Sequence, residues 1–335
     1  MLKPLATLAL FCALPLAAQT PANQTPADQT PTLHTSATLV QVPTLVQSHA
    51  GAVAFNLKDT DFTITDDGIP QRVRLEPESH EPLSLVVLMQ TGSYAPRLFE
   101  YYRHLAGMLA DILAPTPGQT GPNQVAIVNF DLKVTGATPF TSDVSDWTDA
   151  INYPEPGADG AAIFDGLAYA FDLLESQPAT NRHAILVLSQ QQDAGSKTPL
   201  QNILRVAGET NTAIYSLSFL ASIEDMKEPY RELNNPYSGE SWIDLSKPFS
   251  LLLTNMRKNV PASIASVTGG ESIRFNDQNS LDQALGTLNN HIRNRYLLTF
   301  TPTSPKPGLH ALSVRLHNHP DLKITARGTY WADKP

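Results

Sequence analysis

Polar residues that could do chemistry follow the ends of two apolar runs in this chain. Leu83–Met89 is followed by QTGS at 90–93, and His183–Ser189 is followed by QQQD at 190–193. A third polar stretch, at 157–165, leads into a helical pattern. If the apolar runs are parallel strands of one sheet, their carboxyl ends meet at one edge, which is where open α/β sheets bind ligands. We therefore expect a binding site at this edge.

Serine-dependent hydrolysis is one chemistry that this edge could support. Ser93 would need an activating base, and the nine histidines show no spacing that pairs one with it. Gly92-Ser93-Tyr94-Ala95 does not form a G-x-S-x-G elbow. The sequence has no His-Glu-x-x-His pattern, phosphate-binding loop or dinucleotide fingerprint. We predict a protein that is not an enzyme and binds no cofactor, with a hydrolase using Ser93 as the weaker alternative.

Alternating strand and helix patterns position these ends. Near-continuous apolar runs are typical of strands buried on both faces, and they occur at 83–89, 124–130, 183–189 and 212–220. Helical spacing is found at 96–113, 161–174, 199–209, 249–267 and 280–296, with Ser280 as the expected N-cap of the last helix. This alternation predicts an α/β fold with a doubly wound, mostly parallel sheet.

Strand patterns flank this unit on both sides. Before it lie 38–47 and a hairpin at 61–75 with an Asp67-Gly68 turn. After it lie 296–300, 310–316 and 322–331. Neither flank has enough strands to be stable alone, so we expect the two to pair into one β-rich domain. The predicted segments are an N-terminal β segment at 36–80, the α/β domain at 82–292 with an insertion loop at 221–248, and a C-terminal β segment at 293–335.

The N-terminus has the features of a cleavable signal peptide at 1–18. Lys3 precedes the apolar run Leu5–Leu16, and Ala17 and Ala18 follow it. The run is shorter than the roughly 20 residues that a membrane-spanning helix needs. We predict a secreted or periplasmic protein, with no membrane insertion of the mature chain. Residues 19–35 repeat Pro, Thr and Gln and are expected to form a disordered linker.

Composition excludes several kinds of site and partner. The formal net charge of -9 argues against a nucleic acid partner, because no basic stripe is present to neutralise phosphates. Cys12 is the only cysteine and lies in the predicted signal peptide. The mature chain would then have no disulfide, no cysteine nucleophile and no thiolate metal site.

Several segments together resemble the von Willebrand factor A family, and more closely the von Willebrand factor A-related proteins of Acidobacteria. They are DFTITDDGIPQRV, VVLMQTGS, IFDGLAYA, RHAILVLSQQQDAGS, SVTGGESIRF and NRYLLTFTP, in this order. The family carries a metal-ion-dependent adhesion site at the strand ends. The resemblance therefore implies a fold with such a site and a role in binding other proteins.

The metal ligands of the family are largely missing here. Its Asp-x-Ser-x-Ser motif falls on Met89, Thr91 and Ser93, its Thr falls on Ala161, and its second Asp falls on Gln190. Two carboxylates and one hydroxyl are lost, whereas Mg²⁺ requires hard oxygen ligands and releases water reluctantly. We predict that no metal binds at these positions. Three nearby acids could rebuild a site: Asp159, Asp165 and Asp193.

The sequence thus predicts an exported protein-binding or adhesion-type module. An unidentified protein partner would contact the strand-end positions Met89, Thr91, Ser93, Ala161, Gln190 and Asp193, together with the 221–248 insertion. The alternative is a structural scaffold of a cell-envelope assembly, in which the β-rich domain makes the contacts.

Overall fold

The computed structural model describes residues 39–77, 81–219, 259–303 and 306–332. The predicted signal peptide (1–18), the linker (19–35) and the insertion loop (221–248) lie outside the described residues. So does the first part of the helix predicted at 249–267, whose described part is α6 (Val260–Thr268).

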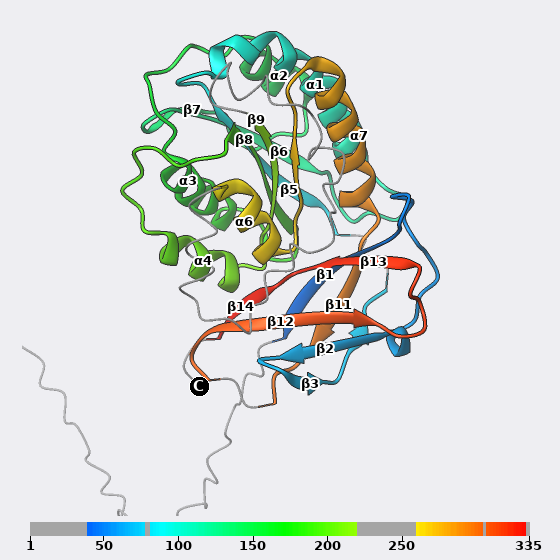
Figure 1. Cartoon of the computed structure of the whole chain (residues 1–335). Helices are drawn as coiled ribbons and strands as arrows, with labels where there is room; N and C mark the ends of the chain where they lie inside the picture. The colour runs from blue at the N-terminus through cyan, green and yellow to red at the C-terminus, as the bar shows by residue number, and fades with distance from the viewer. Residues whose placement is uncertain (1–38, 78–80, 220–258, 304–305, 333–335) are drawn as a thin grey trace, which may run out of the picture. The chain divides into compact units, whose positions relative to one another are not determined.

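A six-stranded sheet with the order β10-β9-β8-β5-β6-β7 forms the centre of the α/β domain (Figure 1). All neighbouring strands are parallel except the edge strand β7, which pairs antiparallel with β6. The strands are β5 (Leu83–Gln90), β6 (Gln124–Phe130), β7 (Val134–Ala137), β8 (Arg182–Gln190), β9 (Ala213–Phe219) and β10 (Ser272–Arg274). The doubly wound, mostly parallel fold predicted from the sequence is confirmed.

Helices cover both faces of this sheet because the side chains of the central strands alternate between two cores. Leu85 and Val87 of β5 pack on one side, and Val86 and Leu88 pack on the other. The first face is covered by α1 (Phe99–Leu113), α2 (Val144–Asn152) and α7 (Gln278–Arg293). The second is covered by α3 (Ile163–Glu175), α4 (Leu200–Glu209) and α6. A short 3₁₀ helix, η2 (Ala95–Leu98), leads into α1.

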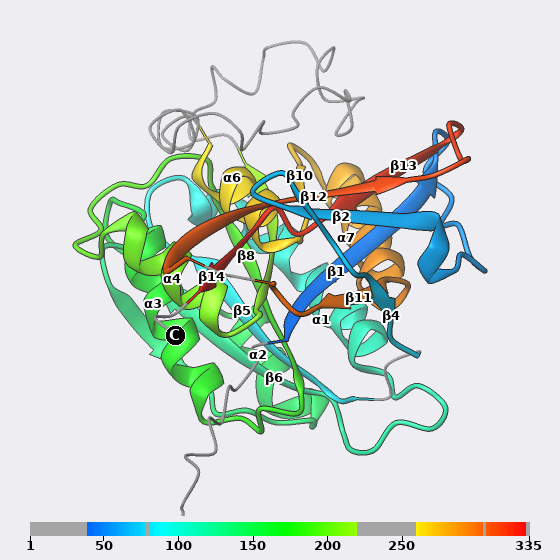
Figure 2. The ribbon, with the colours of Figure 1, turned by 90° about the horizontal axis from the view of Figure 1, so that it is seen from below.

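The terminal segments form two four-stranded sheets that share one core (Figure 2). Their orders are β13-β1-β11-β4 and β14-β12-β2-β3. The N-terminal elements are β1 (Val40–Ser48), η1 (Asp59–Asp61), β2 (Phe62–Asp66), β3 (Ile69–Gln71) and β4 (Arg74–Leu75). The C-terminal strands are β11 (Tyr296–Phe300), β12 (Gly308–Leu316), β13 (Leu322–Ala326) and β14 (Thr329–Ala332). A flanking β-rich domain built from both ends of the chain is therefore confirmed.

Some local expectations were wrong. The last helix begins at Gln278, and its N-cap is Asp277, whose carboxylate accepts a hydrogen bond from the Ser280 amide. Ser280 is the third helical residue, and its hydroxyl accepts from the Asp277 amide in return, which completes a capping box. The strand predicted at 322–331 is divided into β13 and β14, which belong to different sheets.

The β-rich domain meets the α/β domain at the loops that precede β9 and β10; we call this region the domain junction. Arg327, 2% exposed, donates to the carbonyls of Ala207 and Gly208 in the last turn of α4, at 3.2 and 2.9 Å. It also donates to the side-chain oxygen of Asn211. A cation suits the carbonyl end of a helix. Burial lowers the pKa of Arg327 to about 10, which leaves the guanidinium charged at neutral pH.

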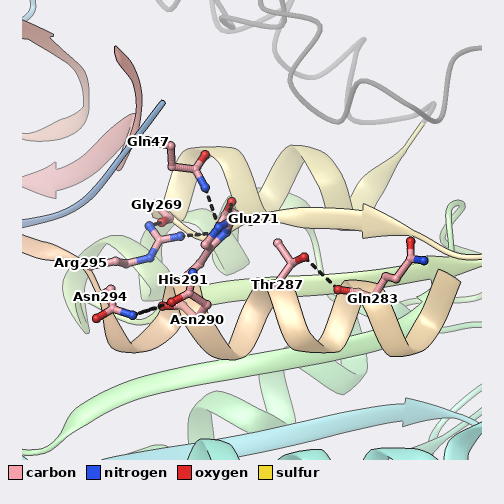
Figure 3. A network of polar contacts seen from close by, with 9 residues as sticks. All are labelled: Gln47, Gly269, Glu271, Gln283, Thr287, Asn290, His291, Asn294 and Arg295. Carbon is pink, nitrogen blue, oxygen red and sulfur yellow. Dashed lines mark hydrogen bonds and ion pairs between the residues drawn. The ribbon is translucent and has the colours of Figure 1, made fainter. Parts of the chain in front are cut away.

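A second buried cluster at the domain junction is shown in Figure 3. Glu271 accepts from Arg295 at 2.7 Å and from His291 Nδ1 at 3.1 Å. Gln47 of β1 reaches His291 Nε2 at 2.5 Å. The cluster links β1 to α7 and to the loop before β10, so it fixes the β-rich domain against the α/β domain.

Candidate functional site

Two glutamines connect the carboxyl ends of β5 and β8. The Gln190 amide donates to the side-chain oxygen of Gln90 at 2.8 Å, and Gln90 Nε2 donates to Gln190 Oε1 at 3.2 Å. Gln190 Nε2 donates in turn to the Gln192 carbonyl. Gln90 is fully buried and Gln190 is 7% exposed. A neutral amide pair therefore occupies the carboxyl ends of these two strands.

Thr91 lies beneath a loop rather than on the surface. Its hydroxyl donates to the Phe130 carbonyl at 3.2 Å, and its own carbonyl accepts from the Gly157 amide at 2.8 Å. Glycines permit this closeness: a Cβ on Gly92 would lie 2.1 Å from the Ala158 carbonyl oxygen. The loop at 157–162 is thus packed directly onto the end of β5.

Ser93 has a positive φ of 51°, and its side chain holds the same loop. Its hydroxyl accepts from the Gly160 amide at 2.7 Å and faces the Gly160 carbonyl at 3.5 Å. Among the described residues, no histidine hydrogen-bonds to Ser93, and Ser189 donates to a backbone carbonyl, that of Gln190. The contacts of Ser93 are those of a loop anchor.

Asp131, which follows β6, is a buried carboxylate at this edge that the sequence reasoning missed. It is 5% exposed. Its Oδ2 accepts from the Ala158 amide at 2.8 Å and its Oδ1 accepts from the Lys133 amide at 3.0 Å. A Cβ on Gly157 would lie 2.8 Å from Oδ2 and 2.9 Å from the Thr91 hydroxyl, so Asp131 lies beside Thr91. Its position directly after the buried strand β6 was the sequence feature that could have identified Asp131 as a site residue.

Asp193 and Asp165, two of the three acids named above for a possible metal site, accept hydrogen bonds from backbone amides. Asp193 Oδ1 accepts from the Ser196 hydroxyl and from the Phe164 amide in the first turn of α3, where negative charge is favourable. Asp165 accepts from the amides of Lys197 and Thr198. Partial burial opposes ionisation of Asp165, but these hydrogen bonds lower its pKa. Asp159 is exposed and does not belong to a metal-type cluster among the described residues.

The predicted site residues divide into buried and accessible ones. Met89, Thr91 and Ala161 have no exposed surface, and Met89 packs in the apolar core on the α1 side of the sheet. Ala161 pairs through its backbone with Ala194, which joins the loop before α3 to the loop after β8. Ser93 is exposed and Asp193 is half-buried. The structure thus brings all three strand-end loops together, but it places most of the predicted residues under the surface.

Leu132 contributes an apolar group to this surface. It lies between β6 and β7 and is 46% exposed. Its side chain rests on two glycines, since a Cβ on Gly160 or Gly195 would come within 2.2 or 2.5 Å of Leu132 Cδ2. We define the strand-end surface as Ser93, Leu132, Asp159 and Gly195. It is a preformed surface with an apolar group beside small and polar ones.

Comparison with known proteins identifies the α/β domain. Residues 88–192 match the family model of the von Willebrand factor type A domain. The fold described above, with its strand-end loops, is that of a von Willebrand factor type A-like domain, here called the VWA-like domain. Among curated proteins, none matches the sequence.

Solved structures with a similar fold include two proteins of Bacteroides. One is an aerotolerance-related membrane protein from Bacteroides fragilis, with 14% identity and a TM-score of 0.40 over 62% of this chain and 98% of that one. Another is the conserved hypothetical protein BatB from Bacteroides thetaiotaomicron, with 14% identity and a TM-score of 0.41 over 63% and 99%. A third is the proximal thread matrix protein 1 of the mussel byssus with a zinc-occupied metal-ion-dependent adhesion site, at 14% identity and a TM-score of 0.43 over 67% and 49%.

The described helices of this chain differ from membrane-spanning helices in length or hydropathy. In the ranges that the structure describes, no helix is both long enough and apolar enough to cross a bilayer.

Proposed function

We propose that this chain is an exported, non-enzymatic protein whose VWA-like domain binds a protein partner through the strand-end surface, without a divalent ion. The observation that carries the proposal is the exposed Leu132 seated on Gly160 and Gly195. A fixed apolar side chain on a rigid base can bury area against a partner with little loss of conformational freedom.

The absence of suitable ligands supports metal independence. The positions that hold Mg²⁺ in the family are here Met89, Thr91, Ser93, Ala161 and Gln190. The Thr91 hydroxyl is used by a backbone carbonyl, and the Ser93 hydroxyl by a backbone amide. Neutral hydroxyl oxygens supply no negative charge to offset the cost of dehydrating Mg²⁺. The residues present therefore do not fit this ion.

The one carboxylate beside Thr91 supports the same conclusion. Both oxygens of Asp131 accept hydrogen bonds from backbone amides, which satisfies a buried charge that would otherwise be costly. Moving either oxygen to a metal would leave the amide of Ala158 or of Lys133 without this acceptor.

The binding test uses one substitution in each domain. Leu132→Ser removes the apolar group from the strand-end surface, and Ile69→Ser removes a similarly exposed group, 60% exposed, from the β-rich domain. A photocrosslinker at Asp159 should capture a defined partner from the envelope fraction of the source organism. We expect the Leu132 variant to lose at least tenfold of this adduct and the Ile69 variant to keep it.

The reverse pattern has a specific meaning. Loss with Ile69→Ser and no effect of Leu132→Ser would contradict the proposal and favour a scaffold whose β-rich domain makes the contacts. Both proteins must show the same thermal melting temperature before the comparison is made.

Export and the lack of enzymatic activity are parts of the proposal with their own supports. Lys3, the apolar run that follows it and the small residues at 17 and 18 support a cleaved signal peptide. Intact mass of the protein secreted from its source should show a new N-terminus near residue 19.

The contacts of Ser93 support a non-enzymatic role. Hydrolysis of ester substrates by the wild-type protein that Ser93→Ala abolishes would contradict the non-enzymatic role.

A further inference from the structure

A cluster in the β-rich domain, on the sheet that contains β2 and β12, has the layout of a metal site. Asp66 ends β2, Asp67 begins the following turn, and His310 lies in β12. His310 Nδ1 faces Asp66 Oδ1 at 2.9 Å and Asp67 Oδ2 at 3.1 Å. One atom from each of the three residues lies within 4.8 Å of the other two. These three atoms converge although 244 residues separate Asp66 from His310.

The hairpin turn explains why the two carboxylates point to one place. Asp67 and Gly68 both have positive φ, 47° and 83°, as a two-residue turn between antiparallel strands requires. Asp66 pairs with Leu312 in the β2–β12 ladder, which brings His310 to the turn. Asp66 and His310 are buried, whereas the Asp67 side chain is 51% exposed. One side of the cluster is therefore open to water.

Each of the three groups is oriented by a partner outside the cluster. Tyr330 donates to the second oxygen of Asp66 at 2.8 Å, and the Ala311 amide donates to the second oxygen of Asp67 at 2.9 Å. His310 Nε2 lies 2.6 Å from the Lys306 carbonyl, to which it donates. A histidine that binds a metal through one ring nitrogen usually gives the other N–H to such an oxygen, and ligating carboxylates are held in the same way.

The charges of the three side chains favour a divalent cation over a proton between Asp66, Asp67 and His310. With a protonated His310, two carboxylates face a single positive charge; with a divalent cation and a neutral ring, the cluster has no net charge. In the described ranges, no Lys or Arg forms an ion pair with Asp66 or Asp67. The buried Glu271–His291 pair differs, because Arg295 contributes a permanent positive charge there.

We propose that Asp66, Asp67 and His310 form a binding site for a divalent transition-metal cation of the zinc class. Imidazole and carboxylate together suit Zn²⁺, which in sites with three protein ligands keeps a fourth position for water. Ligand atoms at Zn²⁺ distances lie about 3.3 Å apart in a tetrahedron, so the two spacings between His310 Nδ1 and the carboxylates, 2.9 and 3.1 Å, are close to what the ion requires. The fourth position falls on the exposed side, next to Asp67.

Equilibrium dialysis of the tag-free full chain against Zn²⁺, with metal content read by atomic spectroscopy, tests the site. We expect about one Zn²⁺ per chain with micromolar or tighter affinity, and at least tenfold weaker binding for Asp67→Asn and His310→Gln. Asp67 is on an exposed turn, so its variant should fold even if the His310 variant does not. Asp282→Asn, which alters an exposed pair with His104, is the matched control and should bind as the wild type does.

Tyr330→Phe separates an ordered site from adventitious binding. It keeps the ring in the core but removes the hydroxyl that orients Asp66, and loss of such a partner typically weakens metal binding 10- to 100-fold. Co²⁺ bound to the wild type should show the strong visible absorption of a four- or five-coordinate centre. Zn²⁺ binding that is absent from the wild type, or equal in the wild type, Asp67→Asn and His310→Gln proteins, would overturn the proposal.

Discussion

The two ends of the parallel sheet are held in different ways. At the carboxyl end, the loops are held by amides, hydroxyls and the carboxylates of Asp131, Asp165 and Asp193, which accept from backbone amides and from the Ser196 hydroxyl. At the amino end, the domain junction contains the buried charges of Arg327 and of the Glu271 cluster. Buried charges are strongly destabilising when one partner is removed. A buried ion pair thus lies where two domains must be aligned, whereas the carboxylates at the carboxyl end accept hydrogen bonds from neutral donors.

The largest expected effect is at Arg327. Arg327→Met should lower the free energy of unfolding by about 3 kcal/mol, because the α4 carbonyls and Asn211 lose a charged donor inside the protein. Arg205→Met on the same helix alters only a surface pair with Glu209 and should cost under about 0.5 kcal/mol. Urea unfolding measures both. Equal values for the two variants would show that the guanidinium does not hold the domain junction.

The next effect is at Glu271. Glu271→Gln keeps the side-chain shape but removes the charge that faces Arg295 and His291, and we expect a loss of about 2 kcal/mol. Glu100→Gln breaks an exposed pair with Arg103 and should change stability by under about 0.5 kcal/mol. Unfolding in guanidinium chloride measures the free energy of unfolding of both variants. An unchanged denaturant midpoint for Glu271→Gln would mean that the cluster aligns the two domains but does not stabilise the protein.

A comparable local effect is expected at the strand-end loops without any change of charge. In Gly92→Ala the new Cβ would lie 2.1 Å from the Ala158 carbonyl oxygen, so the loop must move, at a cost of about 2 kcal/mol. Hydrogen exchange at the Gly157 and Gly160 amides should accelerate, since both donate to the end of β5. Gly107→Ala, in α1 with open space around it, should instead stabilise by up to about 1 kcal/mol.

The smallest expected effect is that of Mg²⁺. Because Met89, Thr91, Ser93, Ala161 and Gln190 carry no carboxylate, millimolar Mg²⁺ should shift the melting temperature by less than about 1 °C. EDTA-treated protein is the reference. A rise of several degrees that EDTA reverses, and that persists in Asp67→Asn, would show that Asp131, Asp159 or Asp193 rearranges to bind the ion.

The sequence predicts those features that depend on long apolar patterns. Runs such as Leu83–Met89 indicate buried parallel strands because both of their faces lie under helices. It failed to predict α2 and β7, because both are short, α2 is largely polar and β7 is largely exposed, so their apolar pattern is weak. At the helix starting near 280, both Asp277 and Ser280 are good caps, and local preference does not separate them.

The sites were harder to predict than the strands. Gln190 and Ser93 were predicted as site residues because they lie at strand ends, and Asp131 also lies directly after a strand but outside the motif that guided the prediction. The Asp66–His310 contact depends on the pairing of β2 with β12, which no local pattern reports. A site assembled by strand register across most of a chain can be recognised only when that register is known.

The pairing of β1 has a consequence for biosynthesis. Val40 pairs with Phe300, and Leu45 pairs with Thr325, so β1 finds its neighbours only after the whole VWA-like domain has been made. Meanwhile the nascent chain carries two unpaired strand edges, which favour aggregation. The strands of the VWA-like domain pair closer together along the chain and can assemble earlier. A transcript truncated before Tyr296 would yield a protein with all six strands of the parallel sheet and an open, adhesive β1.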